Sequence, residues 1–120
     1  MSDDQLVGQF GEQLAKEYLH VNGYKILETN FRTRYGEIDI IVQKDKYLVF
    51  VEVKTRVGTR FGIPFESVRS FKIKHIKKAS TYYLMTQNYP AFNYRVDVIS
   101  IILKADHTVE TLKHFENVTI

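Results

Sequence analysis

Residues 36–56 read GEIDIIVQKDKYLVFVEVKTR, and this stretch decides the fold. Residues 37–43 and 47–55 are rich in β-branched and aromatic side chains, and the polar segment 44–46 separates them. Two such runs joined by a short polar segment are typical of a β-hairpin. We therefore predict two antiparallel strands at the centre of the protein.

The predicted hairpin brings acidic side chains together. Side chains on a strand alternate between its two faces, so Glu37 and Asp39 share one face of their strand, as do Glu52 and Lys54 of the next. A two-residue loop at Asp45-Lys46 puts Asp39 opposite Glu52, with Cβ atoms about 4.5–5.5 Å apart. A loop one residue earlier, at Lys44-Asp45, puts the two on a diagonal, about 7–8 Å apart, and places Glu37 opposite Glu52. A three-residue loop would place Asp39 and Glu52 on opposite faces of the sheet, where they could not form one site.

Two carboxylates at this spacing favour a metal site over a pair of surface charges. Asp39 and Glu52 interrupt strongly apolar strands, and a buried acid is costly without a partner. Mg²⁺ takes oxygen ligands, often from one or two carboxylates, and leaves positions for water and phosphate. Lys54 supplies a positive charge that orients water or offsets charge on a phosphate oxygen. This set suits metal-assisted hydrolysis of a phosphodiester.

The rest of the chain predicts an α/β protein, with a mixed sheet flanked by helices and a single domain over residues 1–120. Apolar residues at helical spacing and β-rich runs extend the pattern on both sides of the hairpin. The predicted elements are a helix at 4–22, a strand at 24–27, a helix at 66–87 and strands at 95–103 and 109–115.

Composition narrows the classes of function. The 120 residues include no cysteine, which excludes a disulfide framework, a thiolate zinc site and a cysteine nucleophile. The net charge is +3, but it divides into −3 for residues 1–52, +8 for 53–95 and −2 for 96–120. The N-terminus is acidic and no apolar run approaches the roughly 20 residues of a membrane helix. We expect a soluble, cytoplasmic protein without a membrane partner.

Several ordered motifs together resemble the YraN-type uncharacterised bacterial family, which is assigned to the restriction-endonuclease-like PD-(D/E)XK nuclease superfamily. The resemblance runs from about residue 8 to residue 100, and Ile38 stands where the superfamily motif has proline. It implies an αβββαβ core with a central mixed β-sheet flanked by helices. The motifs are Gly8-x-x-Gly11-Glu12-x-x-Ala15, Gly36-Glu37-Ile38-Asp39, Phe50-Val51-Glu52-Val53-Lys54-Thr55-Arg56, Phe61-Gly62-x-Pro64 and Arg95-x-Asp97-Val98.

The resemblance also implies roles for individual residues. Asp39, Glu52 and the carbonyl of Val53 are expected to bind Mg or Mn, and Lys54 is expected to assist the attacking water. Archaeal Holliday junction resolvases add a glutamate from the first helix, which implies Glu12. The implied function is a metal-dependent endonuclease that hydrolyses nucleic-acid phosphodiesters, DNA above all, at branched or processed structures.

Basic residues around these carboxylates predict contacts with phosphates. On the second predicted helix, Lys74, Lys77 and Lys78 fall on the polar arc and are interpreted as a solvated face. Tyr82 and Tyr83 are candidates for stacking on bases, but aromatic residues at this spacing more often belong to the core. The candidate nucleic-acid-binding residues are Arg32, Arg34, Arg56, Arg60 and Lys72.

Three further expectations come from the residues. Glu12 lies at the edge of the apolar stripe of its helix, and its small neighbours Gly8 and Ala15 predict a close approach to the sheet. Asp97 interrupts an apolar strand, and we expect it to pair with Arg95 or with a basic helix residue. One site in a small domain suits a homodimer acting on two strands. The alternative function is a non-catalytic nucleic-acid-binding module that keeps the nuclease fold.

Overall fold

The computed structural model describes residues 3–58, 70–87 and 93–118, without the side chains of residues 70–73. Arg60 and the side chain of Lys72, both predicted to bind nucleic acid, lie outside this part of the chain. The described elements, in chain order, are α1 (Asp3–Val21), β1 (Lys25–Thr33), β2 (Gly36–Lys44), β3 (Tyr47–Val57), α2 (Ser70–Thr86), β4 (Tyr94–Leu103) and β5 (Val109–Phe115).

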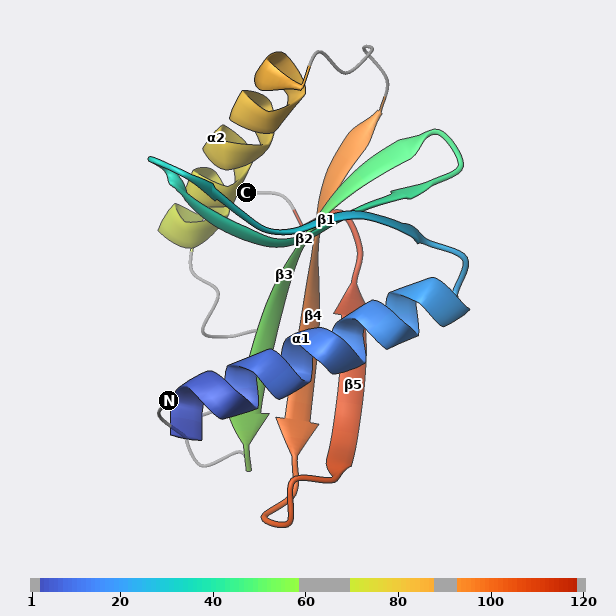
Figure 1. Cartoon of the computed structure of the whole chain (residues 1–120), viewed down its shortest axis with the longest axis vertical. Coiled ribbons are helices and arrows are strands. Elements are labelled where there is room, and N and C mark those ends of the chain that lie inside the picture. The colour runs from blue at the N-terminus through green and yellow to red at the C-terminus, as the bar shows by residue number, and fades with distance from the viewer. Residues whose placement is uncertain (1–2, 59–69, 88–92, 119–120) are drawn as a thin grey trace.

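The five strands form one mixed sheet in the order β1-β2-β3-β4-β5 (Figure 1). β3 and β4 run parallel and every other neighbouring pair runs antiparallel. Because parallel neighbours need a crossover, α2 lies in the chain between β3 and β4. The α/β class is confirmed, and the sheet with its two helices is consistent with a restriction-endonuclease-like core.

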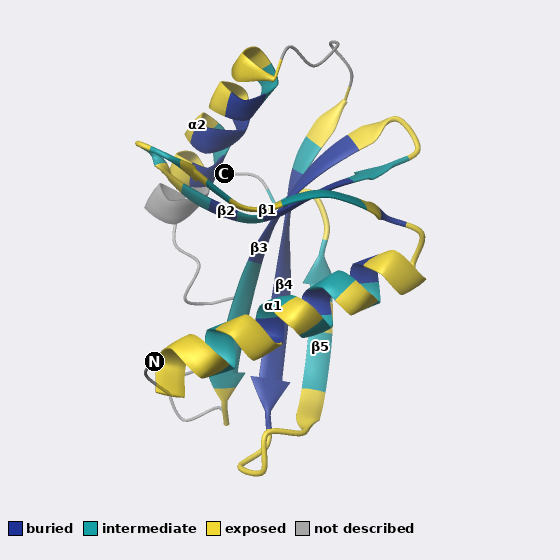
Figure 2. Cartoon of the chain, viewed as in Figure 1, coloured by how far each residue is buried: buried dark blue, intermediate teal, exposed yellow. Residues whose placement is uncertain are grey.

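Helices cover both faces of the sheet, which explains why the central strands are apolar on both sides (Figure 2). One core cluster joins Ala15 and Leu19 of α1 to Ile40 of β2 and to neighbouring strands. The other joins Ile76 of α2 to Ile41 of β2. Burial of one such side chain contributes about 1.5–3 kcal/mol, so these two layers hold the helices on the sheet.

The hairpin register matches the two-residue loop. Lys44 pairs with Tyr47 and Ile40 pairs with Val51, so the turn consists of Asp45 and Lys46. Asp45 has a φ of 53°, a left-handed conformation that aspartate tolerates better than most residues. Continued by one residue, this register puts Asp39 opposite Glu52, as predicted.

The two strands separate just beyond that point. The β2–β3 ladder ends at the Ile40–Val51 pair, whereas β2 remains paired with β1 as far as Gly36. In Figure 1 the β1–β2 hairpin accordingly turns away while β3 continues beside β4. We call this separation the strand fork. Asp39 and Glu52 lie at the point where the two strands separate. Beyond this point β3 no longer pairs with β2, and this edge of β3 lies beside α1.

Close approach of α1 to the sheet occurs at Gly11, whereas the sequence pointed to the small neighbours Gly8 and Ala15. A Cβ on Gly11 would lie only 2.8 Å from the Thr55 Cβ and 2.9 Å from its Cγ2, whereas one on Gly8 would meet nothing within 4 Å. Ala15 is buried and contributes to the α1 core. Gly11 therefore sets the distance between α1 and β3, and with it the position of Glu12.

Candidate active site

Asp39 and Glu52 form a carboxylate pair at the fork, in which Glu52 is buried and Asp39 is half-buried. Asp39 Oδ2 accepts a hydrogen bond from the Val53 N–H at 2.8 Å, which replaces the ladder bond lost when β2 turns away. Glu52 is only 5% exposed. Burial, followed by the nearby charges of Glu52 and Glu12, raises the pKa of Asp39 to about 8 despite the hydrogen bond from Val53. The pair is electrostatically strained, and a cation is the partner that relieves such strain.

Val53 directs backbone polar groups into the fork. The N–H and C=O of one strand residue point toward the same neighbouring strand, and the Val53 N–H points to Asp39. The Val53 carbonyl therefore faces the open side of β3, where no β2 residue pairs with it. This arrangement adds one main-chain oxygen to the two carboxylates.

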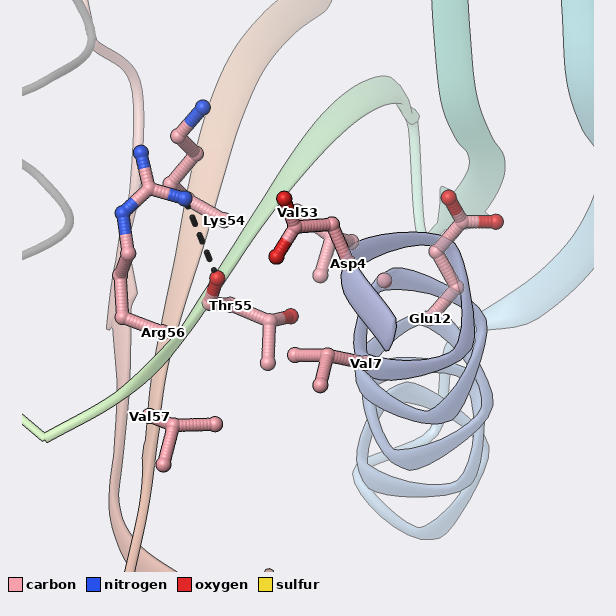
Figure 3. A pocket seen from close by; sticks show the side chains of 9 residues that line it. Asp4, Val7, Glu12, Val53, Lys54, Thr55, Arg56 and Val57 are labelled. Carbon is pink, nitrogen blue, oxygen red and sulfur yellow. Dashed lines mark hydrogen bonds between the residues drawn. The ribbon is translucent and has the colours of Figure 1, made fainter. Parts of the chain in front are cut away.

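Lys54 and Arg56 leave β3 on the side opposite Val53 and Thr55, whose side chains point toward α1 (Figure 3). Arg56 Nη1 donates to the Thr55 carbonyl at 3.3 Å. A cleft of about 500 Å³ lies between this strand edge and α1, and we call it the α1–β3 cleft. Its lining combines two acids, two bases and apolar groups: Asp4, Val7, Gly8, Glu12, Val53, Lys54, Thr55, Arg56 and Val57.

Glu12 is held at the border of this cleft by Asn30, a residue that the sequence analysis did not select. The Asn30 side-chain amide donates to Glu12 at 3.1 Å and to Glu37 at 2.8 Å, so one amide joins two carboxylates from different elements. Glu37 also forms an ion pair with Arg32 at 3.3 Å. Asn30 has a φ of 52°, a left-handed conformation that asparagine adopts more readily than most residues. An asparagine among residues that form a strand was the sequence feature that could have pointed to it.

The donor set at the fork is two carboxylates and one carbonyl. Among the described residues no group of three or more histidine, cysteine, aspartate or glutamate side chains is arranged to hold a metal ion. Glu12 acts on Asp39 through its charge and is hydrogen-bonded to Asn30. Because Mg²⁺ commonly binds one or two carboxylates and keeps several waters, the chemistry of Asp39, Glu52 and Val53 fits such an ion.

Those predicted phosphate-binding residues that the structure describes do not share one surface. Arg56 lines the α1–β3 cleft with Lys54. Arg32 lines an adjoining hollow of about 490 Å³ that also contains Glu12 and Asn30. Arg34 lies in a third place, a groove between the β1–β2 turn and α2. The basic residues that precede Asp39 are thus divided between two sides of the β1–β2 hairpin.

Asp97 lies in a separate polar network that stabilises the fold. Its predicted pairing with Arg95 is present at 3.0 Å, and Asp97 also binds His114 Nε2 at 2.7 Å and the Asn117 N–H at 2.9 Å. Burial opposes the charge of Asp97, but these hydrogen bonds outweigh it and lower the pKa of the carboxyl group. The contact with His114 comes from a strand 17 residues away and had no sequence signal.

These features define an α/β protein whose core is consistent with the restriction-endonuclease-like fold and whose strand fork holds a carboxylate pair, Asp39 and Glu52. The chain belongs to the family described as Uncharacterised protein family UPF0102, whose model matches residues 11–101. No helix of the described residues has the length and apolar character needed to cross a membrane.

Relatives from several bacteria match most of the chain. A UPF0102 protein of Caldicellulosiruptor bescii is 49% identical over 104 residues, which cover 86% of this chain and 87% of that protein. One from Syntrophomonas wolfei is 50% identical over 100 residues, covering 82% and 85% respectively. One from Clostridium kluyveri is 44% identical, covering 89% and 88%. The residues matched by the family model include the strand fork and the part of α1 from Gly11 onward.

Proposed function

We propose that this protein is a metal-dependent nuclease that hydrolyses phosphodiester bonds of nucleic acid, DNA in particular. The observation that carries the proposal is the pairing of the half-buried Asp39 with the buried Glu52 at the strand fork, with Lys54 two residues further along β3. Two adjacent carboxylates that are largely removed from water cost stability, and binding of a divalent cation would offset that cost. Branched or processed DNA is the proposed form of the substrate.

Asp39, Glu52 and the Val53 carbonyl are the proposed ligands of Mg²⁺ or Mn²⁺, with Glu12 adding negative charge at the border of the cleft. When bound, such an ion polarises a phosphate oxygen and lowers the pKa of a water molecule. Asp39 must then be ionised, so loading the site releases the proton that its raised pKa retains at neutral pH.

The basic residues of β3 have a complementary role. Lys54 orients the attacking water and offsets the negative charge that develops on the phosphate. Arg56 holds a flanking phosphate through its planar guanidinium group. On β3 the proposed cation ligands Glu52 and Val53 are therefore followed directly by the residues that act on water and phosphate, Lys54 and Arg56.

The test is cleavage of branched, flapped and single-stranded DNA with Mn²⁺, using purified wild type and the variants Asp39→Asn, Glu52→Gln and Lys54→Met. We expect each variant to lose activity by at least about a hundredfold. Glu110→Gln is the matched control, because Glu110 is an exposed acid on β5, and it should retain activity. Cleavage that needs no metal, or that survives all three substitutions, contradicts the proposal.

Calorimetric titration with Mn²⁺ separates this function from the alternative, a nucleic-acid-binding module without catalysis. The nuclease should bind Mn²⁺ through Asp39 and Glu52, and binding should disappear in either variant. Absence of Mn²⁺ binding, even with DNA present, favours the module. Cleavage of both strands of a junction further implies two copies of the chain, which sedimentation with junction DNA would detect.

A further inference from the structure

A second hollow lies between the turn that joins β1 to β2 and the exposed side of α2, and we call it the turn–α2 groove. Its volume is about 550 Å³, close to that of the α1–β3 cleft. The two hollows share no residue. The lining of the groove is basic, aromatic and apolar: Arg34, Tyr35, Lys77, Lys78, Thr81, Tyr82 and Met85.

The charge of the groove has one sign. Arg34 and Lys78 are exposed, Lys77 is partly buried, and none of the lining residues is a carboxylate. α2 contains no aspartate or glutamate anywhere in its sequence. A solvated helix face normally mixes charges, so lysines without interspersed acids are better suited to a polyanion than to water alone.

Aromatic rings lie among these cations. Tyr82 is 43% exposed, and its ring centroid lies 6.4 Å from that of Phe31 on β1. The guanidinium carbon of Arg34 is 4.9 Å from the centre of the Tyr35 ring, and Lys78 Nζ is 6.0 Å from it. Arg34 also donates to the Tyr35 hydroxyl at 2.7 Å, which holds the guanidinium group beside the groove. From the sequence, a core position for Tyr82 was favoured over stacking on bases, and the structure places Tyr82 at the surface.

We propose that the turn–α2 groove is a binding site for single-stranded nucleic acid. Arg34, Lys77 and Lys78 contact phosphates, and an unpaired base stacks on Tyr82. Proteins that bind single strands combine a basic groove with exposed aromatic rings, because every base has a stacking face. In a duplex the bases are stacked on one another, so they present no free face to the ring of Tyr82.

The groove and the strand fork are connected through β2. Ile76 and Ala79 of α2 pack in one cluster with Ile38 of β2, the residue before Asp39. Tyr35 precedes Asp39 by four residues, which corresponds to about 13 Å along an extended strand. The role of the groove as a substrate subsite rests on the proposed function, and it implies that a substrate with a single-stranded part reaches the fork from the groove.

The test is fluorescence anisotropy with labelled oligonucleotides of about 16 nucleotides, as single-stranded DNA, single-stranded RNA and duplex DNA, in EDTA so that no cleavage occurs. The variants are Arg34→Gln/Lys78→Gln and Tyr82→Leu, which keeps an apolar side chain against Phe31. Lys104→Gln/Lys113→Gln is the charge-matched control, because both lysines are exposed and neither lines the groove.

We expect wild type to bind single strands more tightly than duplex. Tyr82→Leu should weaken single-strand binding by about tenfold. The double variant should also weaken it, and should lower the slope of log affinity against log salt by about 0.7 for each lost cation. Affinities of the control should stay within about twofold of wild type. A preference for DNA or RNA identifies the strand type.

Equal binding by wild type and both groove variants overturns the inference, as does equal affinity for duplex and single strands. Both binding outcomes are measured in EDTA and so do not depend on whether the protein cleaves DNA. Loss of cleavage in Asp39→Asn with normal single-strand binding supports the groove and leaves the catalytic proposal intact. Groove binding by a wild type that cleaves nothing supports the groove and contradicts the catalytic proposal.

Discussion

Replacing Gly11 with alanine tests whether this glycine sets the distance between α1 and the sheet. The added methyl group would lie 2.8 Å from the Thr55 Cβ and 2.9 Å from its Cγ2. Carbon atoms in favourable contact are about 3.5–4.0 Å apart, so α1 or β3 must move by roughly 1 Å. Gly8→Ala is the matched control, since it lies one helical turn away and its methyl group meets nothing within 4 Å.

The expected magnitudes follow from two effects. Alanine stabilises a helix interior by about 1 kcal/mol relative to glycine, and both variants gain this. Overpacking costs about 1–3 kcal/mol, and only Gly11→Ala incurs it. The free energy of unfolding of Gly11→Ala should therefore lie about 1–3 kcal/mol below that of Gly8→Ala, which itself should exceed wild type by up to about 1 kcal/mol.

Urea unfolding followed by circular dichroism measures these differences. Adding Thr55→Ala to Gly11→Ala removes two of the three contacting atoms, Oγ1 and Cγ2, and should recover about half of the loss or more. Thr55→Ala alone should be nearly neutral, because the Thr55 hydroxyl oxygen is buried without a hydrogen-bond partner. Equal stability of Gly11→Ala and Gly8→Ala, or no recovery in the double variant, would refute the reasoning.

Two further predictions concern pH. In EDTA, wild type should lose stability as pH rises from about 4 to about 8, because the pKa of Asp39 is raised to about 8 in the folded state by burial and Glu52. Asp39→Asn should remove this slope in urea titrations, and Mn²⁺ should stabilise wild type alone; an unchanged slope would exclude Asp39 as its source. The lowered pKa of Asp97 has the opposite sign, since burial is outweighed by bonds from His114 and Arg95. The ionised Asp97 stabilises the fold above about pH 4, and this stabilisation is lost as pH falls. Asp97→Asn should therefore reduce the loss of unfolding free energy between neutral and acid pH. An unchanged loss in this variant would contradict the assignment to Asp97.

Much of the fold was predictable because it depends on local patterns. The alternation of residues 37–55, the polar turn and the helical spacing of residues 4–22 each reflect a short-range preference, and all three elements are present. β1 was predicted too short, at 24–27, and extends to Thr33. Its second half contains polar residues and a left-handed Asn30, and it is held as a strand by pairing with β2.

The sequence by itself determined which carboxylates belong together. Alternation along the strands and a two-residue turn suffice to bring Asp39 opposite or diagonal to Glu52 and to put Lys54 on the face of Glu52. It also left the choice of turn open, since two registers satisfied the same pattern. Only the paired strands, with Asp45 in a left-handed conformation, decided between them.

The tertiary structure alone decided how the surroundings of that pair are arranged. The end of the β2–β3 ladder, the contact of Gly11 with Thr55 and the amide bridge from Asn30 join segments far apart in the chain. The same holds for the groove that gathers the Arg34 turn beside the lysines of α2. Such contacts depend on how helices pack on a twisted sheet, and residue spacing within one element carries no information about that packing.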